Sequence, residues 1–293
     1  MDRLDFCIVG AMKAATTTLA SLLAAHPGVV MAEPKEPGYF SRDERYARGL
    51  EWYRAHFRDA DGVLVGEAST CYSRRVPFPH AASRLAAFSP GVKLIYILRH
   101  PADRAIAHYV HEMRLRFRDG KPVIGFDECC GADPAVLSAS EYEKEIDHLL
   151  ASFPRDQLLL LRFEDLIGEQ GRVFGEVQSW LGLERVDTEA AWENRAMDKA
   201  RSHEVDRRVE GVTKNPAVRA LRAVLPASVR SAGRRRLKRL LAKTGGVERE
   251  IEAFEASLDR PTGDRRRVLV ERYAPTVAAV GAMTGWDLSD WRQ

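Results

Sequence analysis

The sequence predicts an α/β fold in which a central, mainly parallel sheet is flanked by helices. Short apolar runs of strand length alternate along the chain with segments in which apolar residues recur at helical spacing. The clearest of these runs, Val92–Leu98, is followed by a helical pattern that opens at Asp103. Because strands that alternate with helices form βαβ units, we expect the sheet to be mainly parallel and covered on both faces.

The composition is that of a globular protein. The chain has 293 residues, of which 45% are hydrophobic and 30% are charged, and its formal net charge is +3. This net charge is too small to indicate a partner by itself. We expect one domain over residues 1–293, with an α/β core at 5–203, a basic helical insertion at 204–246, and C-terminal helices at 247–293 that pack on the core.

The cysteines and the apolar stretches indicate in which cellular compartment the protein is expected. Cys7, Cys71, Cys129 and Cys130 have neither the number nor the spacing of a disulfide framework or a zinc site. An apolar run begins at Phe6, which leaves no room for a signal peptide, and no uncharged apolar stretch reaches the roughly 18 residues of a membrane span. We therefore expect a soluble, cytoplasmic protein.

The segment that begins at Phe6 has the pattern of a strand, a loop and a helix. The apolar run Phe6–Val9 breaks at Gly10, and leucines then recur at helical spacing. Lys13 and Thr16–Thr18 therefore fall at a helix N-terminus, where free backbone N–H groups and the positive end of the helix dipole favour a phosphate. Taken alone, the segment is also compatible with an ordinary strand–turn–helix, and the phosphate site depends on agreement with the rest of the chain.

A loop with two fixed charges follows the second predicted strand. Val29–Met31 has the apolar character of a short strand, and prolines and a glycine prevent regular structure across Ala32–Phe40. The loop holds Lys35 and Glu36 on a stiff backbone, although a solvated surface turn would show the same pair. Residues 44–58 are then expected to be helical.

The remaining elements continue the alternation. We expect strands at Val63–Glu67 and Val92–Leu98, and helices at 79–88, from Asp103 through Phe117, near 248–258 and at 264–283. The carboxyl ends of parallel strands meet at one edge of a sheet, and ligands bind there in such folds. We therefore expect Lys13, Glu36, Glu67 and Arg99 to become neighbours although they lie far apart in the sequence.

Several motifs, from about residue 5 to the last tryptophan, resemble those of one protein family and occur in the same order. Gly10–Leu19, Lys35–Phe40 and Leu98–Ala105 resemble the 5′-phosphosulfate loop, the loop of the catalytic base and the 3′-phosphate motif of sulfotransferases that use 3′-phosphoadenosine 5′-phosphosulfate (PAPS). The likeness is to the heparan-sulfate type and its bacterial relatives. The family's later strand and helix are similar to Phe163–Leu166 and Trp180–Leu183. The C-terminal end of many bacterial members is similar to Tyr273–Pro275 and Gly285–Trp291. The resemblance implies a P-loop-like three-layer fold, PAPS as sulfuryl donor and 3′-phosphoadenosine 5′-phosphate (PAP) as product.

The resemblance also implies roles for individual residues. Lys13 would stabilise the leaving phosphate and Glu36 would act as general base. Glu67 is a second candidate, either as base or as a group that orients the acceptor. The predicted donor-binding residues are Lys13, Ala14, Ala15, Thr16, Thr17, Thr18, Arg99 and His108.

Two positions depart from the family pattern. Ala15 replaces a loop glycine, and a side chain there restricts positive φ and close backbone approach. Ala107 replaces a serine, so that one hydroxyl contact to the 3′-phosphate is missing. Arg99 would then hold that phosphate with help from His108 or from a downstream basic residue such as Lys199 or Arg201.

The segment 207–243 changes the character of the chain. It holds twelve Lys or Arg residues against one acid, Glu210. One interpretation is a solvated helical excursion, and a second is a mobile cap that attracts anionic acceptors or contacts a membrane surface peripherally. No nucleic-acid-binding motif accompanies the charge, so we predict no nucleic-acid partner.

These observations predict an enzyme that transfers a sulfuryl group from PAPS to a hydroxyl or amine of a small-molecule or carbohydrate acceptor, without a metal ion. The Gly-x-x-x-x-Gly-Lys-Ser/Thr pattern of Mg²⁺-dependent phosphate loops is absent. Two alternatives stay open: a P-loop-type nucleotide-dependent kinase, and a non-catalytic nucleotide-binding protein that kept the phosphate cradle. The choice of acceptor depends on loop shape.

Overall fold

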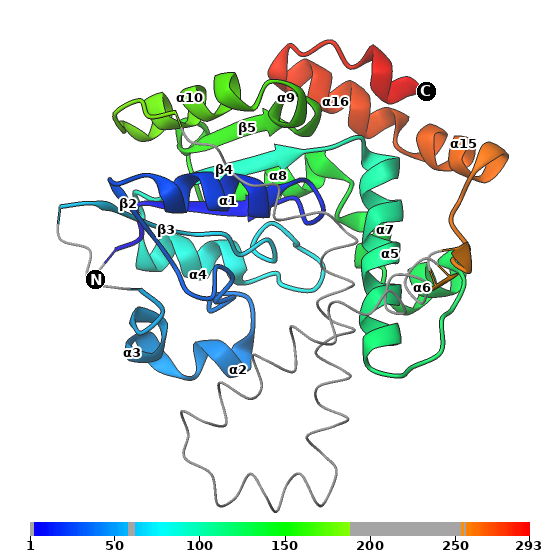
Figure 1. The fold of residues 1–293 in the computed structure, drawn as a ribbon, viewed down its shortest axis with the longest axis horizontal. Helices are drawn as coiled ribbons and strands as arrows, with labels where there is room; N and C mark the ends of the chain where they lie inside the picture. Colours follow the sequence, from blue (N-terminus) through cyan, green and yellow to red (C-terminus); the bar gives the residue numbers. More distant parts are fainter. Residues whose placement is uncertain (1–2, 58–61, 188–252, 255) are drawn as a thin grey trace, which may run out of the picture. The chain divides into compact units, whose positions relative to one another are not determined.

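A computed structural model describes residues 3–57, 62–187, 253–254 and 256–293 (Figure 1). The chain divides into two compact units. The first comprises Met1–Tyr109, Phe126–Glu193 and Arg260–Gln293 and contains the five strands described below; the second comprises Val110–Gly125 and Asn194–Asp259. The expectation of one domain stays a prediction, and its basic insertion at 204–246 lies outside the described residues.

The first unit is built on a five-stranded sheet with the order β2-β3-β1-β4-β5. All four pairs of neighbouring strands are parallel. The strands are β1 (Phe6–Gly10), β2 (Val29–Met31), β3 (Leu64–Glu67), β4 (Lys93–Leu98) and β5 (Leu158–Arg162). The predicted α/β class with a parallel sheet flanked by helices is confirmed. Every residue of the central strand β1 is buried, as the continuous apolar run requires.

Helices connect and flank the strands. The longer ones are α1 (Thr16–Ala25), α4 (Ala81–Phe88), α5 (Pro101–Arg118), α8 (Tyr142–Leu150), α10 (Gln170–Leu181), α15 (Gly263–Arg272) and α16 (Ala274–Thr284). The shorter ones are α2 (Asp43–Tyr46), α3 (Gly49–Arg54), α6 (Phe126–Ala132), α7 (Ala135–Ser138), α9 (Phe163–Gly168), and the 3₁₀ turns η1 (Arg155–Gln157) and η2 (Ser289–Arg292). The leucines that predicted α1 are buried against the sheet.

Three sequence expectations differ from the structure. The helix expected over residues 44–58 is two short helices, α2 and α3, because the chain turns at Gly49 with a φ of 81°. The helix expected over 264–283 is interrupted at Tyr273, since Pro275 starts a new helix and cannot continue the old one. The motif Phe163–Leu166, expected to correspond to a late strand, lies in α9 directly after β5.

The closing motif of the chain belongs to the core of the first unit. Trp291, in η2, has only 1% of its surface exposed. Its ring lies 6.4 Å from that of Tyr142 and 6.3 Å from that of His100, which follows β4. Val277 and Val280 of α16 are buried in the same cluster. The C-terminal elements therefore pack next to the edge of the sheet where β4 ends.

Candidate active site

The loop between β1 and α1 leaves the first turn of α1 open to a ligand. Ala15 is the N-cap residue, and no side chain caps the helix. Lys13 and Ala15 have φ values of 75° and 59°. The sequence analysis expected Ala15 to restrict positive φ, but the residue adopts this conformation, at a cost of about 1 kcal/mol. A helix start with free N–H groups and a lysine beside it suits an anionic ligand.

Gly10 fixes where this loop starts. A Cβ atom at Gly10 would lie 2.5 Å from the Ser73 Oγ and 2.8 Å from the ring of Tyr96. These distances leave no space for a side chain. The end of β1 is therefore held closely against β4 and the segment after β3, and the loop leaves the sheet at a defined point.

Arg99 reaches the same loop from the end of β4. Its Nη1 donates a hydrogen bond of 3.1 Å to the backbone carbonyl of Lys13, and its guanidinium lies 4.7 Å from the ring centroid of Phe163. The hydroxyl of Tyr142 donates to the Arg99 carbonyl at 2.8 Å and fixes the backbone at this point. Lys13 and Arg99 are thus neighbours at one edge of the sheet, as the parallel topology predicts.

The loop that carries Glu36 is anchored on the end of β3. The Ala68 N–H donates to the Lys35 carbonyl at 2.8 Å, and the Gly38 N–H donates to the Ser69 hydroxyl at 3.0 Å. The Glu36 side chain itself is exposed. Its carboxylate accepts from the Lys35 ammonium at 2.6 Å and from the Thr70 hydroxyl at 3.5 Å. A fixed backbone therefore presents an accessible carboxylate.

Glu67 lies inside the protein, at the end of β3. Its side chain has no exposed surface, and burial raises its pKa to about 8. Hydrogen bonds from the hydroxyls of Tyr72, Ser69 and Tyr53 oppose this rise, and the nearby Glu36 carboxylate adds to it. Glu67 is therefore neutral at pH 7 and does not face an open acceptor surface. Its contact with the Ser69 hydroxyl, at 3.4 Å, links it to the Glu36 loop.

His108, a predicted donor-binding residue, is also buried. Its Nδ1 lies 3.3 Å from Nη1 of Arg104, which is itself fully buried and donates to the Ser140 hydroxyl and the Val136 carbonyl. Burial and, to a smaller extent, the Arg104 charge lower the pKa of His108 to about 2. The imidazole is neutral, so that any help it gives to a phosphate would come through hydrogen bonding and not through charge. Its predicted role stays a prediction.

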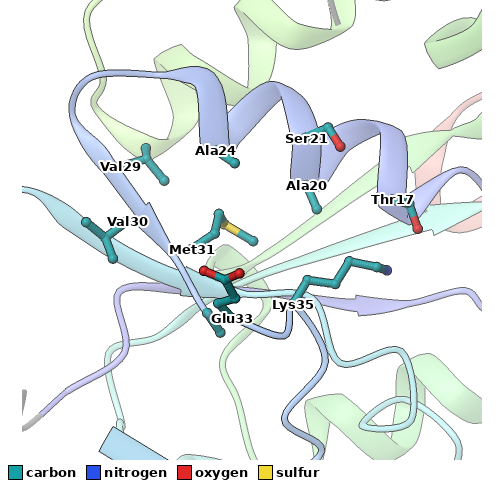
Figure 2. A pocket seen from close by; sticks show the side chains of 10 residues that line it. Thr17, Ala20, Ser21, Ala24, Val29, Val30, Met31, Glu33 and Lys35 are labelled. Atoms are coloured by element: carbon teal, nitrogen blue, oxygen red, sulfur yellow. The ribbon is translucent and has the colours of Figure 1, made fainter. Parts of the chain in front are cut away.

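The small residues of the loop differ in their access to ligands. Ala14, Thr16 and Thr18 are buried, whereas Thr17 and Ala15 are partly exposed. Thr17 also lines a pocket of about 340 Å³ between α1 and β2, shown in Figure 2. Ala107 is partly exposed on α5, and the downstream candidates Lys199 and Arg201 lie outside the described residues.

Sequence reasoning missed the residues that position the loops. Ser69 and Thr70 contact Gly38 and Glu36, and Tyr142 clamps the Arg99 backbone. The one sequence signal for the first two is their place directly after a predicted strand that ends at the carboxyl edge. The hydrogen bond between Tyr142 and Arg99 joins residues 43 positions apart, and no local sequence pattern predicts it.

The described part of the chain shows neither a metal-ligating cluster nor a helix that could cross a membrane. Within residues 3–57, 62–187, 253–254 and 256–293, no group of three or more His, Cys, Asp and Glu side chains is placed to hold a metal ion. Over the same ranges, no helix combines the length and the apolar character that a membrane crossing would need.

The fold and the edge of the sheet together define a class of protein. A parallel sheet whose central strand leads through a lysine-bearing loop into an uncapped helix is the architecture of α/β proteins that bind nucleotide phosphates. The arginine at the end of the neighbouring strand gives this edge a second cation. The chain belongs to the PAPS-dependent sulfotransferase family: a family model, the sulfotransferase domain, matches residues 3–219.

Comparison with individual proteins agrees with this assignment. The chain is 35% identical over 191 residues to human heparan sulfate glucosamine 3-O-sulfotransferase 6. This alignment covers 62% of this chain and 53% of that protein. It is 27% identical over 198 residues to the bifunctional heparan sulfate N-deacetylase/N-sulfotransferase 1 of Caenorhabditis briggsae. This second alignment covers 61% of this chain and 22% of that protein. The chain thus spans about half the length, or less, of these curated relatives.

A solved structure shows a similar fold. The crystal structure of a sulfotransferase from Alicyclobacillus acidocaldarius matches with a TM-score of 0.66, covering 100% of both chains at 22% sequence identity. At this identity the likeness concerns the fold. It confirms the predicted sulfotransferase-like arrangement of a parallel sheet flanked by helices.

Proposed function

We propose that this protein transfers a sulfuryl group from PAPS to a hydroxyl or amine of a small-molecule or carbohydrate acceptor. The observation that carries the proposal is the junction of three loops at one edge of the sheet. Arg99 bonds to the Lys13 backbone, and the loop of Glu36 is anchored on the neighbouring strand β3. Because the curated relatives are named for heparan sulfate, a carbohydrate is the first acceptor class to test.

The donor side of the site fits a nucleotide with phosphates at both ends of its ribose. The free N–H groups of the first turn of α1 and the Lys13 ammonium would hold the 5′-phosphosulfate. Arg99 would hold the 3′-phosphate, stiffened by Phe163 and by the Lys13 carbonyl. PAPS supplies the activated sulfuryl group. Lys13 would stabilise the charge that grows on the phosphate oxygen when its bond to sulfur breaks.

The acceptor side requires a base that reaches solvent. Glu36 meets this requirement, since its carboxylate is exposed and its loop is held by Ala68 and Ser69. In the transfer, the acceptor oxygen or nitrogen forms a bond to sulfur and its proton passes to Glu36. The electron pair of the broken S–O bond stays on the phosphate of PAP. Glu67, buried and neutral, would position the Glu36 loop and not take the proton.

Transfer of labelled sulfate from PAPS to a panel of glycan and alcohol acceptors tests the proposal. Lys13→Ala and Glu36→Gln should each lower turnover by about 100-fold or more, the usual range for a lost charge-stabilising group or general base. Glu36→Gln should still bind PAP, measured by thermal shift, because Glu36 lies on the acceptor side. Glu51→Gln, on the exposed surface of α3, is the matched control.

The result that contradicts this assignment is unchanged turnover in both variants. Stabilisation by ATP with Mg²⁺ but not by PAP would favour the kinase alternative instead. A protein that binds PAP and transfers sulfate to no acceptor would match the non-catalytic alternative.

A further inference from the structure

A groove of about 340 Å³ runs beside the proposed transfer site, between α1 and the edge strand β2 (Figure 2). One wall is a single face of α1, whose lining residues recur at helical spacing. The other wall is β2 and the start of the Glu36 loop. The lining residues are Thr17, Ala20, Ser21, Ala24, Val29, Val30, Met31, Ala32, Glu33 and Lys35.

One end of the groove lies at the residues of the proposed reaction. Thr17 belongs to the first turn of α1, two residues after the N-cap, and the Lys35 ammonium is 2.6 Å from the Glu36 carboxylate. Figure 2 shows Thr17 and Lys35 at the same end, and Ala24 with Val29 at the other. The separation of seven positions between Thr17 and Ala24 corresponds to about 10 Å along the helix. The groove therefore leads away from the acceptor position by roughly two helical turns.

The lining is apolar and carries no net charge. Six of its ten residues are alanine, valine or methionine, and its two charged residues, Glu33 and Lys35, have opposite signs. The Lys35 ammonium is already paired with Glu36. A polysulfated glycan would need several cations along such a wall. The volume lies in the range of small-molecule sites, which are mostly apolar with a few polar groups that fix the orientation of the ligand.

We infer that the acceptor carries an uncharged, apolar arm that lies in this groove while its hydroxyl or amine meets Glu36. This inference rests on the proposed function, and it narrows the acceptor to an amphipathic molecule. The small side chains of α1 are what leave space for the arm, because Ala20 and Ala24 face the groove where larger residues would fill it.

A chain-length series measures the arm directly. The full chain is titrated calorimetrically with n-butyl and n-octyl β-D-glucoside, below their micellar concentrations, with and without PAP. Each buried methylene should strengthen binding about three- to four-fold, so the octyl compound should bind on the order of 100-fold more tightly than the butyl compound. The same two compounds serve as acceptors in the sulfate-transfer assay.

Two variants at adjacent positions locate the site. Ala24→Phe fills the far end of the groove, and Ala25→Phe places the same ring on the exposed surface of the same helix, outside the lining. Ala24→Phe should abolish the preference for the octyl chain and leave PAP binding intact, whereas Ala25→Phe should keep both. Thermal shifts of both variants verify folding.

The outcomes separate this inference from the proposed function. Sulfate transfer without any preference for the octyl chain, or an equal loss of preference in both variants, would overturn the groove as an acceptor site and leave the proposed function standing. Chain-length-dependent binding without sulfate transfer would refute the acceptor role of the groove together with the function. A preference that Ala24→Phe alone removes, seen in both binding and turnover, supports the inference.

Discussion

Replacing Glu67 by glutamine should stabilise the protein at neutral pH. The folded protein raises the pKa of this carboxyl from 4.5 to about 8, because the side chain is fully buried. Below pH 4.5 both folded and unfolded chains are protonated at this residue. As the pH rises toward 8, only the unfolded chain ionises, and stability falls by about 1.4 kcal/mol per pH unit. At pH 7 the loss amounts to about 3 kcal/mol.

Glutamine keeps the shape of Glu67 and its contacts with Ser69 but cannot ionise. Urea unfolding at pH 5, 6, 7 and 8 should therefore show a difference between Glu67→Gln and wild type that grows with pH in favour of the variant, to about 3 kcal/mol at pH 7 and about 4 kcal/mol at pH 8. Glu145 has its pKa raised to about 7 by burial and titrates in the same range, but it is present in both proteins and cancels in the difference. Glu51→Gln, at an exposed position, is the control and should show no such trend.

The same variant decides whether Glu67 acts as the base. If Glu67 only positions the Glu36 loop, Glu67→Gln should keep turnover within about tenfold of wild type, whereas loss of a general base costs about 100-fold or more. A flat stability difference across pH would refute the buried, neutral carboxyl. A collapse of turnover with PAP binding intact would refute the positioning role.

Two further predictions concern the donor loops. Ala15→Gly should raise the free energy of unfolding by about 1 kcal/mol in urea, because glycine adopts the φ of 59° without strain; an unchanged or lowered value would contradict the strain. Arg99→Ala should weaken PAP binding by about 10- to 100-fold in calorimetry, the worth of a charged hydrogen bond of about 1.5–3 kcal/mol, while Arg118→Ala, exposed on α5, should not. Equal affinity in the two arginine variants would remove Arg99 from the site.

The parts of the fold that follow from local pattern were predictable. Phe6–Val9 and Leu94–Leu98 are apolar without alternation, as strands buried on both faces must be, and both lie in strands of the parallel sheet. The proximity of Lys13 and Arg99 follows from the parallel pairing of β1 and β4, because the carboxyl ends of these two strands lie at the same edge of the sheet. These inferences need only periodicity and strand direction.

The parts that depend on distant packing were not predictable. Glu67 becomes neutral because the fold buries it completely, although hydrogen bonds from Tyr53 and Tyr72, which come from separate segments, favour its charged form. The left-handed backbone at Ala15 contradicts the intrinsic preference of alanine, and the loop imposes it. The groove beside α1 exists only where the alanines of one helix face oppose β2. Each of these features is set by tertiary contacts that no window of sequence contains.

The order of the strands explains how three distant loops can serve one transfer. The Glu36 loop follows the edge strand β2, yet the Ala68 and Ser69 contacts anchor it at the end of β3. Since β1 lies between β3 and β4, the edge of the sheet presents Glu36, Lys13 and Arg99 in that order. Neighbouring strands are about 4.8 Å apart, so β3 and β4 stand about 10 Å apart. In-line transfer needs the acceptor atom, the sulfur and the leaving phosphate oxygen along one line. Under the proposed roles, this strand order places the acceptor side, at Glu36, and the far end of the donor, at Arg99, on opposite sides of Lys13.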